Sequence, residues 1–122
     1  MSLPPTAPSW PRPPACLPAG SLDLPPQNAQ VTVAGLVLLR QRPGTAHGVI
    51  FITLEDETGT VNVIVWSTVF EQYRRAVIAG RMLRVTGRIQ REAQVVHLIA
   101  EQIEDVSDLL DTLLSPDFRQ SA

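Results

Sequence analysis

The fold is decided by residues 48–66, GVIFITLEDETGTVNVIVW. Apolar and polar side chains alternate on both sides of an acidic turn that ends at Gly59. Alternation with a period of two predicts two strands of a hairpin, each with one buried and one open face. Gly59 suits the turn because glycine tolerates a positive φ.

The two faces of this hairpin predict a core and a binding surface. We expect the apolar set to point inward: Ile50, Ile52, Leu54, Val61, Val63 and Val65. We expect the other set to lie outside: Phe51, Thr53, Asn62, Ile64 and Trp66. An aromatic ring beside polar groups on a small barrel is typical of a platform for a nucleobase. The alternatives are that Phe51 packs under a loop or against a partner, and that Trp66 covers the base of the following helix.

Three more strands are predicted outside the hairpin. Residues 31–40 alternate, and Gly35 within them indicates a bulge or a sharp bend. Residues 82–90 and 95–103 alternate again, separated by a short polar turn.

A helix is predicted between the third and fourth strands. After Trp66 the apolar period becomes helical, Thr68 and Glu71 form a capping box, and Gly80 is a C-terminal stop. Five strands with a helix in this position predict an all-β fold, the five-stranded OB-fold Greek-key barrel.

The two ends of the chain differ from the predicted barrel in composition. Residues 1–30 hold nine of the eleven prolines, which predicts a Pro-rich disordered leader. The OB-fold domain is expected over 31–106, and 107–122 are expected to form a short helix and an acidic tail. Helical spacing of leucines starts near Glu104 and includes Leu109, Leu110, Leu113 and Leu114. This tail could fold back on the barrel or bind a partner.

The sequence contains few candidate residues for catalysis. Cys16 is the single cysteine, which excludes an internal disulfide and a cysteine-cluster metal site and fits a cytoplasmic location. The acidic residues 55–57 alternate in direction and cannot all converge on one ion. No phosphate-cradling glycine loop, nucleophile elbow or membrane-length apolar segment is present in the sequence. We therefore expect no enzyme, no cofactor, no metal and no membrane partner.

The sequence contains more candidate residues for binding a nucleic acid. The net charge is −2, yet the chain has no lysine, so arginines carry all ten of its strong positive charges. This usage fits either a GC-rich genome or recognition of phosphates and bases by planar guanidinium groups. The candidates near the two loops that flank an OB-fold groove are Arg40, Arg42 and His47 on one side and Arg88 and Arg91 on the other. The alternative for Arg88 is a solvated strand face.

Few platforms and few arginines predict weak binding. Stacking of one base on an aromatic ring contributes roughly 1–3 kcal/mol. Each phosphate contact adds a salt slope of about −0.7. We expect an affinity of roughly micromolar or poorer, with little sequence preference.

Several strings resemble one known family. VAGLV (33–37), RQRPGTA (40–46), GVIFITLEDETG (48–59) and GRIQRE (87–92) resemble the C-terminal OB-fold domain of the bacterial error-prone DNA polymerase, a paralogue of the C-family polymerase α subunit. The resemblance covers about residues 31–110. It implies a module that holds single-stranded template DNA during translesion synthesis, and it implies no polymerase activity, since the catalytic domains have no counterpart here.

The core string FITLED is also similar to the anticodon-binding OB domains of class II aminoacyl-tRNA synthetases. In those domains, the phenylalanine that matches Phe51 stacks on a base. His47 departs from the polymerase pattern, where a lysine or a small residue is expected, and a mostly neutral histidine makes a weaker phosphate contact.

Two function classes follow from the sequence. The first is binding of single-stranded nucleic acid, DNA or RNA. The second is docking onto a polymerase or DNA-repair partner through the apolar outer residues Leu36, Leu38 and Ile64. The chain could also be a stand-alone protein, a gene remnant without function or an excised segment.

Overall fold

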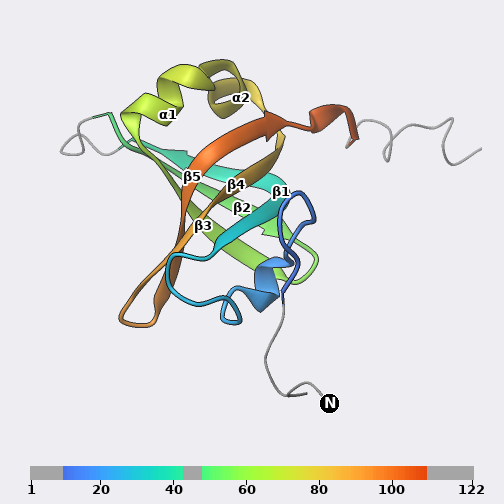
Figure 1. Cartoon of the computed structure of the whole chain (residues 1–122). Coiled ribbons are helices and arrows are strands. Elements are labelled where there is room, and N and C mark those ends of the chain that lie inside the picture. Colours follow the sequence, from blue (N-terminus) through green and yellow to red (C-terminus); the bar gives the residue numbers. More distant parts are fainter. Residues whose placement is uncertain (1–9, 43–47, 110–122) are drawn as a thin grey trace, which may run out of the picture.

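The computed structural model describes residues 10–42 and 48–109, in which five strands close into a barrel (Figure 1). The strands are β1 (Gln30–Gln41), β2 (Ile50–Asp56), β3 (Gly59–Val65), β4 (Met82–Glu92) and β5 (Val95–Asp105). Their order is β1-β2-β3-β5-β4, and β3 pairs with β5 in parallel while the other pairs are antiparallel. The predicted five-stranded OB-fold barrel is confirmed.

Strand β1 is long enough to pair with two neighbours. Its first part, from Gln30 to Leu36, pairs with β4, and its second part, from Leu36 to Gln41, pairs with β2. Gly35 lies at the changeover, where a Cβ atom would be 2.7 Å from the carbonyl oxygen of Glu55. The register shift itself lies two residues further on, between Val37 and Leu39. Gly35 therefore allows the close approach of β2, and the bulge follows it.

The barrel interior is built by the predicted alternation. All six inward hairpin residues are buried, with Leu54 and Val65 fully so. Strand β4 adds Leu83, Val85 and Ile89. Burial of one such side chain contributes roughly 1.5–3 kcal/mol relative to exposure, so the strand faces are strongly specified.

The N-terminal segment corrects our prediction. We expected residues 1–30 to be disordered, but Leu17, Ala19 and Leu22 belong to the core and η1 (Ala19–Ser21) lies below the barrel in Figure 1. The Leu17 amide donates to the Thr32 carbonyl at 2.6 Å. Prolines exclude regular structure, but the apolar side chains between them can still pack against a core. Proline content alone therefore does not predict whether the segment is ordered. Residues 1–9 lie outside the described part.

The opposite end of the barrel is covered by two short helices, α1 (Ser67–Gln72) and α2 (Arg74–Ala79), instead of the single helix we predicted (Figure 1). The N-cap is Trp66 and makes no side-chain capping bond, so the predicted capping box at Thr68 and Glu71 is wrong. The predicted stop at Gly80 is confirmed, since its amide donates to Ala76 at 2.9 Å.

The C-terminal segment is described only in part. Glu104 and Asp105 belong to β5 instead of the predicted helix, residues 107–109 form a helical turn, and 110–122 lie outside the described residues. None of the helices in the described ranges is both long and apolar enough to span a bilayer.

Candidate nucleic-acid interface

A continuous patch forms on the outer face of β2, β3 and β5. Phe51 pairs with Ile64 and Thr53 pairs with Asn62 across the hairpin. The parallel pairing of β3 with β5 then places Ile99 beside Ile64 and His97 beside Asn62. Directly opposed residues have Cβ atoms about 4.5–5.5 Å apart, so the side chains are in contact range. We call this the outer-face patch, and its members are Phe51, Thr53, Asn62, Ile64, His97 and Ile99.

The patch combines an apolar row with a polar row. Phe51, Ile64 and Ile99 are half-buried, so the ring of Phe51 is supported from the side while part of it remains open. Thr53 Oγ1 lies 3.5 Å from Asn62 Oδ1, at the long limit of a hydrogen bond. Because Asn62 is exposed, its amide can exchange this contact for a ligand. The arrangement can stack a flat ring and bond its polar edge.

Two neighbouring segments extend the patch. On β1, Gln41 pairs with Phe51 and Leu39 pairs with Thr53. Trp66 directly follows β3, is the N-cap residue of α1 and is 52% exposed, so about half of its surface is open to solvent. The end of β3 thus carries a second aromatic side chain, which is more exposed than the half-buried Phe51.

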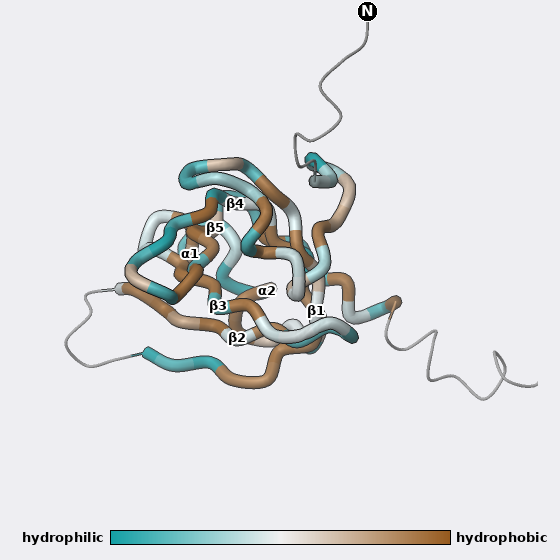
Figure 2. The backbone as a smooth tube through the Cα atoms, turned by 90° about the horizontal axis from the view of Figure 1, so that it is seen from below, coloured by the Kyte–Doolittle hydropathy of each residue, from teal (hydrophilic) through white to brown (hydrophobic). Residues whose placement is uncertain are grey.

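Arg42 contributes positive charge at the end of β1. Its guanidinium lies 5.1 Å from the ring centroid of Phe70, and that of Arg74 lies 5.2 Å from the same ring. Both line a cavity of about 250 Å³ with Gly48, Ser67 and Glu71. Figure 2 shows the end of β1 changing from hydrophobic leucines to hydrophilic residues just before the grey segment. Arg74 also pairs with Glu71 at 3.2 Å, so the excess charge of this cluster is small.

Three predicted arginines are held by protein groups. Arg40 donates to the carbonyl of Val77 at 2.6 Å and to that of Gly80, which ties β1 to the end of α2. Arg91 donates to the Leu22 carbonyl at 3.0 Å. Arg88 pairs with Glu101 at 3.0 Å and donates to the Asn28 carbonyl at 3.1 Å. Carbonyls at segment ends need donors, and long guanidinium side chains reach them.

The structure therefore brings together part of the predicted site. Phe51, Thr53, Asn62 and Ile64 form one surface, and Trp66 follows β3 directly. Arg42 follows β1 and lies over Phe70 of α1. Arg40 and Arg91 contact other parts of the fold. Arg88, on β4, pairs with Ile99 on β5. His47 lies outside the described residues.

Comparison with known proteins identifies the family. A family model described as "OB-fold nucleic acid binding domain" matches residues 31–106. The chain belongs to this family. This OB-fold domain is 63% identical over 87 residues to the error-prone DNA polymerase of Ruegeria pomeroyi, and 54% identical over 83 residues to error-prone DNA polymerase 1 of Rhizobium meliloti.

These matches cover most of the chain but little of the polymerases. They span 71% and 68% of this chain and only 8% and 7% of the two relatives, so the region corresponds to a small OB domain within error-prone polymerases. Among solved structures, asparaginyl-tRNA synthetase from Pyrococcus horikoshii, complexed with asparaginyl-adenylate, is similar with a TM-score of 0.56 and 25% identity. That match covers 66% of this chain and 19% of the synthetase.

Sequence reasoning missed two members of the patch of this OB-fold domain. His97 and Ile99 come from β5, which closes the barrel against β3. The alternation of β5 could have indicated them. Leu98 and Ala100 are apolar and point inward, so residues 97 and 99 must point outward. Only the parallel pairing of β3 with β5 shows that they adjoin Asn62 and Ile64.

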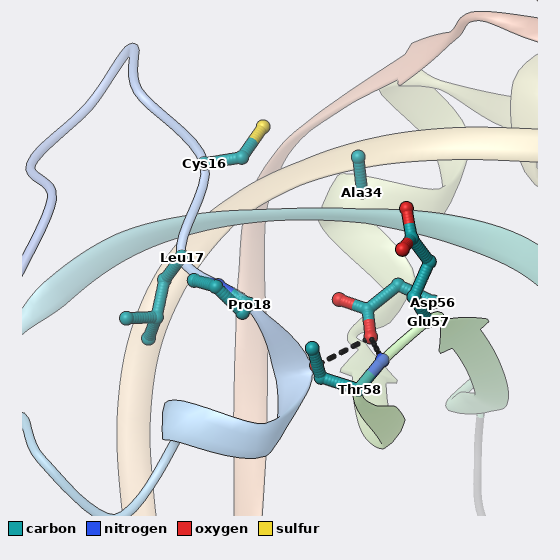
Figure 3. Close-up of a pocket in the computed structure, with 7 residues that line it drawn as sticks. All are labelled: Cys16, Leu17, Pro18, Ala34, Asp56, Glu57 and Thr58. Atoms are coloured by element: carbon teal, nitrogen blue, oxygen red, sulfur yellow. Dashed lines mark hydrogen bonds between the residues drawn. The ribbon is translucent and has the colours of Figure 1, made fainter.

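The acidic turn of this OB-fold domain has a structural role. The Asp56 carboxylate accepts hydrogen bonds from Thr58 and Gly59 in the turn and from the Ala19 amide at 2.8 Å. Figure 3 shows this carboxylate beside a cavity of about 290 Å³ that Cys16, Leu17 and Pro18 also line. Within residues 10–42 and 48–109, no three His, Cys, Asp or Glu side chains are grouped so that they could hold a metal ion.

Proposed function

We propose that this OB-fold domain binds single-stranded nucleic acid, namely template DNA in error-prone translesion synthesis, weakly and with little sequence preference. The observation that carries the proposal is the outer-face patch, where a partly open Phe51 ring adjoins Thr53, Asn62 and His97 on three paired strands. The family of nucleic-acid-binding domains and the polymerase relatives support it. In this proposal the domain acts in the cytoplasm and has no polymerase activity of its own.

The binding mode follows from the chemistry of the patch. One base stacks on Phe51, and its edge exchanges hydrogen bonds with the polar row on Thr53 and Asn62. Every base has a π face, so stacking gives affinity without strong sequence preference. Arg42 meets a phosphate at the end of the patch, which makes binding sensitive to salt.

The test is an anisotropy titration of the full chain with a labelled single-stranded oligonucleotide at about 50 mM and about 200 mM salt. Phe51→Ala should weaken binding roughly 5- to 150-fold, the equivalent of losing one stacked base. Phe51→Leu keeps the apolar bulk and should lose most of the same affinity. Arg42→Ala should reduce the salt slope by about 0.7.

The matched control is Arg84→Ala. Arg84 lies on β4, outside the patch, and forms an ion pair at 2.8 Å with Glu104 of β5. Its substitution should therefore leave the affinity and the salt slope as in the wild type. Absence of binding at high micromolar protein in low salt would overturn the proposal.

A second candidate function is docking onto a polymerase or repair-complex partner. The observation in its favour is an apolar stretch on β1, where Leu36, Leu38 and Leu39 are 38%, 52% and 49% exposed. Leu38→Asp should leave oligonucleotide binding unchanged and should disrupt such docking. A protein that binds neither oligonucleotide nor partner would match the third alternative, a fragment without function.

A further inference from the structure

A third cavity lies between the N-terminal segment and β4. Its volume is about 570 Å³, within the range of ligand pockets. The side chains that line it include two arginines, three amides and an indole: Arg12, Arg88, Gln27, Asn28, Gln30 and Trp10. Guanidinium groups bind phosphates, and amides offer both donors and acceptors to a base edge. The lining therefore has the chemistry of a nucleotide site.

Trp10 and Arg12 form a stacked pair at this cavity. The Arg12 guanidinium lies 5.1 Å from the ring centroid of Trp10. The Trp10 Nε1 atom is buried and has no hydrogen-bond partner. A buried donor without a partner costs roughly 1–3 kcal/mol, and an entering acceptor group would recover part of this cost. Trp10 is thus the one side chain in the described residues with an unused buried donor.

A row of paired residues links the cavity to the outer-face patch. Arg88 lines the cavity and pairs with Ile99, Ile99 pairs with Ile64, and Ile64 pairs with Phe51. Three strand spacings separate Phe51 from Arg88, which is about 14 Å. A single strand that crosses the barrel from Phe51 reaches Arg88 after roughly four nucleotides at the stacked spacing of about 3.4 Å.

Arg88 is oriented at this junction. Glu101 accepts from Arg88 at 3.0 Å and from Gln30 Nε2 at 2.9 Å, while Arg88 also donates to the Asn28 carbonyl. The side chain of Arg88 remains about half exposed, at 52%. Glu101 offsets one positive charge, and Arg12 leaves the cavity with a net positive lining.

We propose that the cavity between Trp10, Arg12 and Arg88 is a second nucleotide subsite, occupied by the same single strand that stacks on Phe51. The inference rests on the proposed function of the outer-face patch. It makes the N-terminal segment part of the binding surface, so that long strands contact both sites while short strands occupy the patch alone.

The chain offers a direct readout because it has two tryptophans, one at each site. The indole N–H signals of Trp10 and Trp66 in the NMR spectrum can be assigned with Trp10→Phe. Oligothymidines of roughly two and roughly twelve nucleotides are shorter and longer than the span of roughly four nucleotides between the two sites. The Trp66 signal should shift with both lengths, and the Trp10 signal should shift with the longer one only.

A variant gives the matching affinity test. Arg12→Ala should weaken the longer strand about fivefold or more and leave the shorter one unchanged, whereas Phe51→Ala should weaken both. Suppose that the longer strand binds and shifts the Trp66 signal, while the Trp10 signal does not move and Arg12→Ala binds the longer strand as tightly as the wild type. The subsite is then wrong and the proposed function stands. If wild-type protein binds neither strand, the proposed function fails and the subsite with it.

Discussion

Leu17→Ala tests the finding that the N-terminal segment completes the core. Leu17 is 1% exposed and packs in the hydrophobic cluster with residues of all five strands. The substitution removes three carbon groups, which costs about 2.4 kcal/mol of transfer free energy. Incomplete collapse of the cavity raises the expected loss to about 3–5 kcal/mol. The midpoint of thermal unfolding should fall by at least about 10 °C for a domain of this size.

The assay is urea unfolding followed by far-ultraviolet circular dichroism, with Leu24→Ala as the matched control. Leu24 lies in the same segment but is 43% exposed, so its substitution should cost less than about 1 kcal/mol. Both variants replace leucine by alanine in the same segment, so their effect on backbone preference is the same. Only the substitution at Leu17 leaves a cavity in the core. Equal free energies of unfolding for the two variants would refute the role of Leu17 in the core.

Two further predictions concern stability. Gly35→Ala should destabilise the fold by roughly 1–3 kcal/mol, because the new Cβ would lie 2.7 Å from the Glu55 carbonyl oxygen, and unchanged urea unfolding would contradict this. For Asp56, burial raises the pKa, but bonds from the Thr58 side chain and three backbone amides lower it by more, so the net pKa lies below its ordinary value. Its stabilising effect is then present above the unfolded-state pKa of about 3.9 and is lost as the pH falls through the lower folded-state pKa. Asp56→Asn should therefore destabilise the fold more at about pH 7 than at about pH 3, and an equal loss at both would refute it.

The strands and the patch could be predicted because both depend on local alternation. A period of two separates Ile52 from Phe51 and Val63 from Asn62 before any tertiary contact is known. The helical region was harder, because the break at Tyr73 gives two short helices where apolar spacing alone predicts one.

The N-terminal segment and the arginines could not be predicted in the same way. Proline content excludes regular structure, but it does not reveal that Leu17 and Leu22 meet an open barrel end. A guanidinium group reaches far from its backbone, so its partner depends on the tertiary fold. Arg40 therefore binds the end of α2, although its place in the sequence equally suited a groove.

The same strand carries core and binding surface in this domain, and this couples the two. In β2, Ile52 and Leu54 are buried while Phe51 and Thr53 face outward. A register slip of one residue would expose the apolar set and bury the polar one. Each buried isoleucine or leucine opposes the slip by roughly 1.5–3 kcal/mol, far more than the patch side chains contribute to stability. Core packing thus fixes the geometry of the patch, and the outer residues remain free to change in affinity or specificity at little cost to the fold.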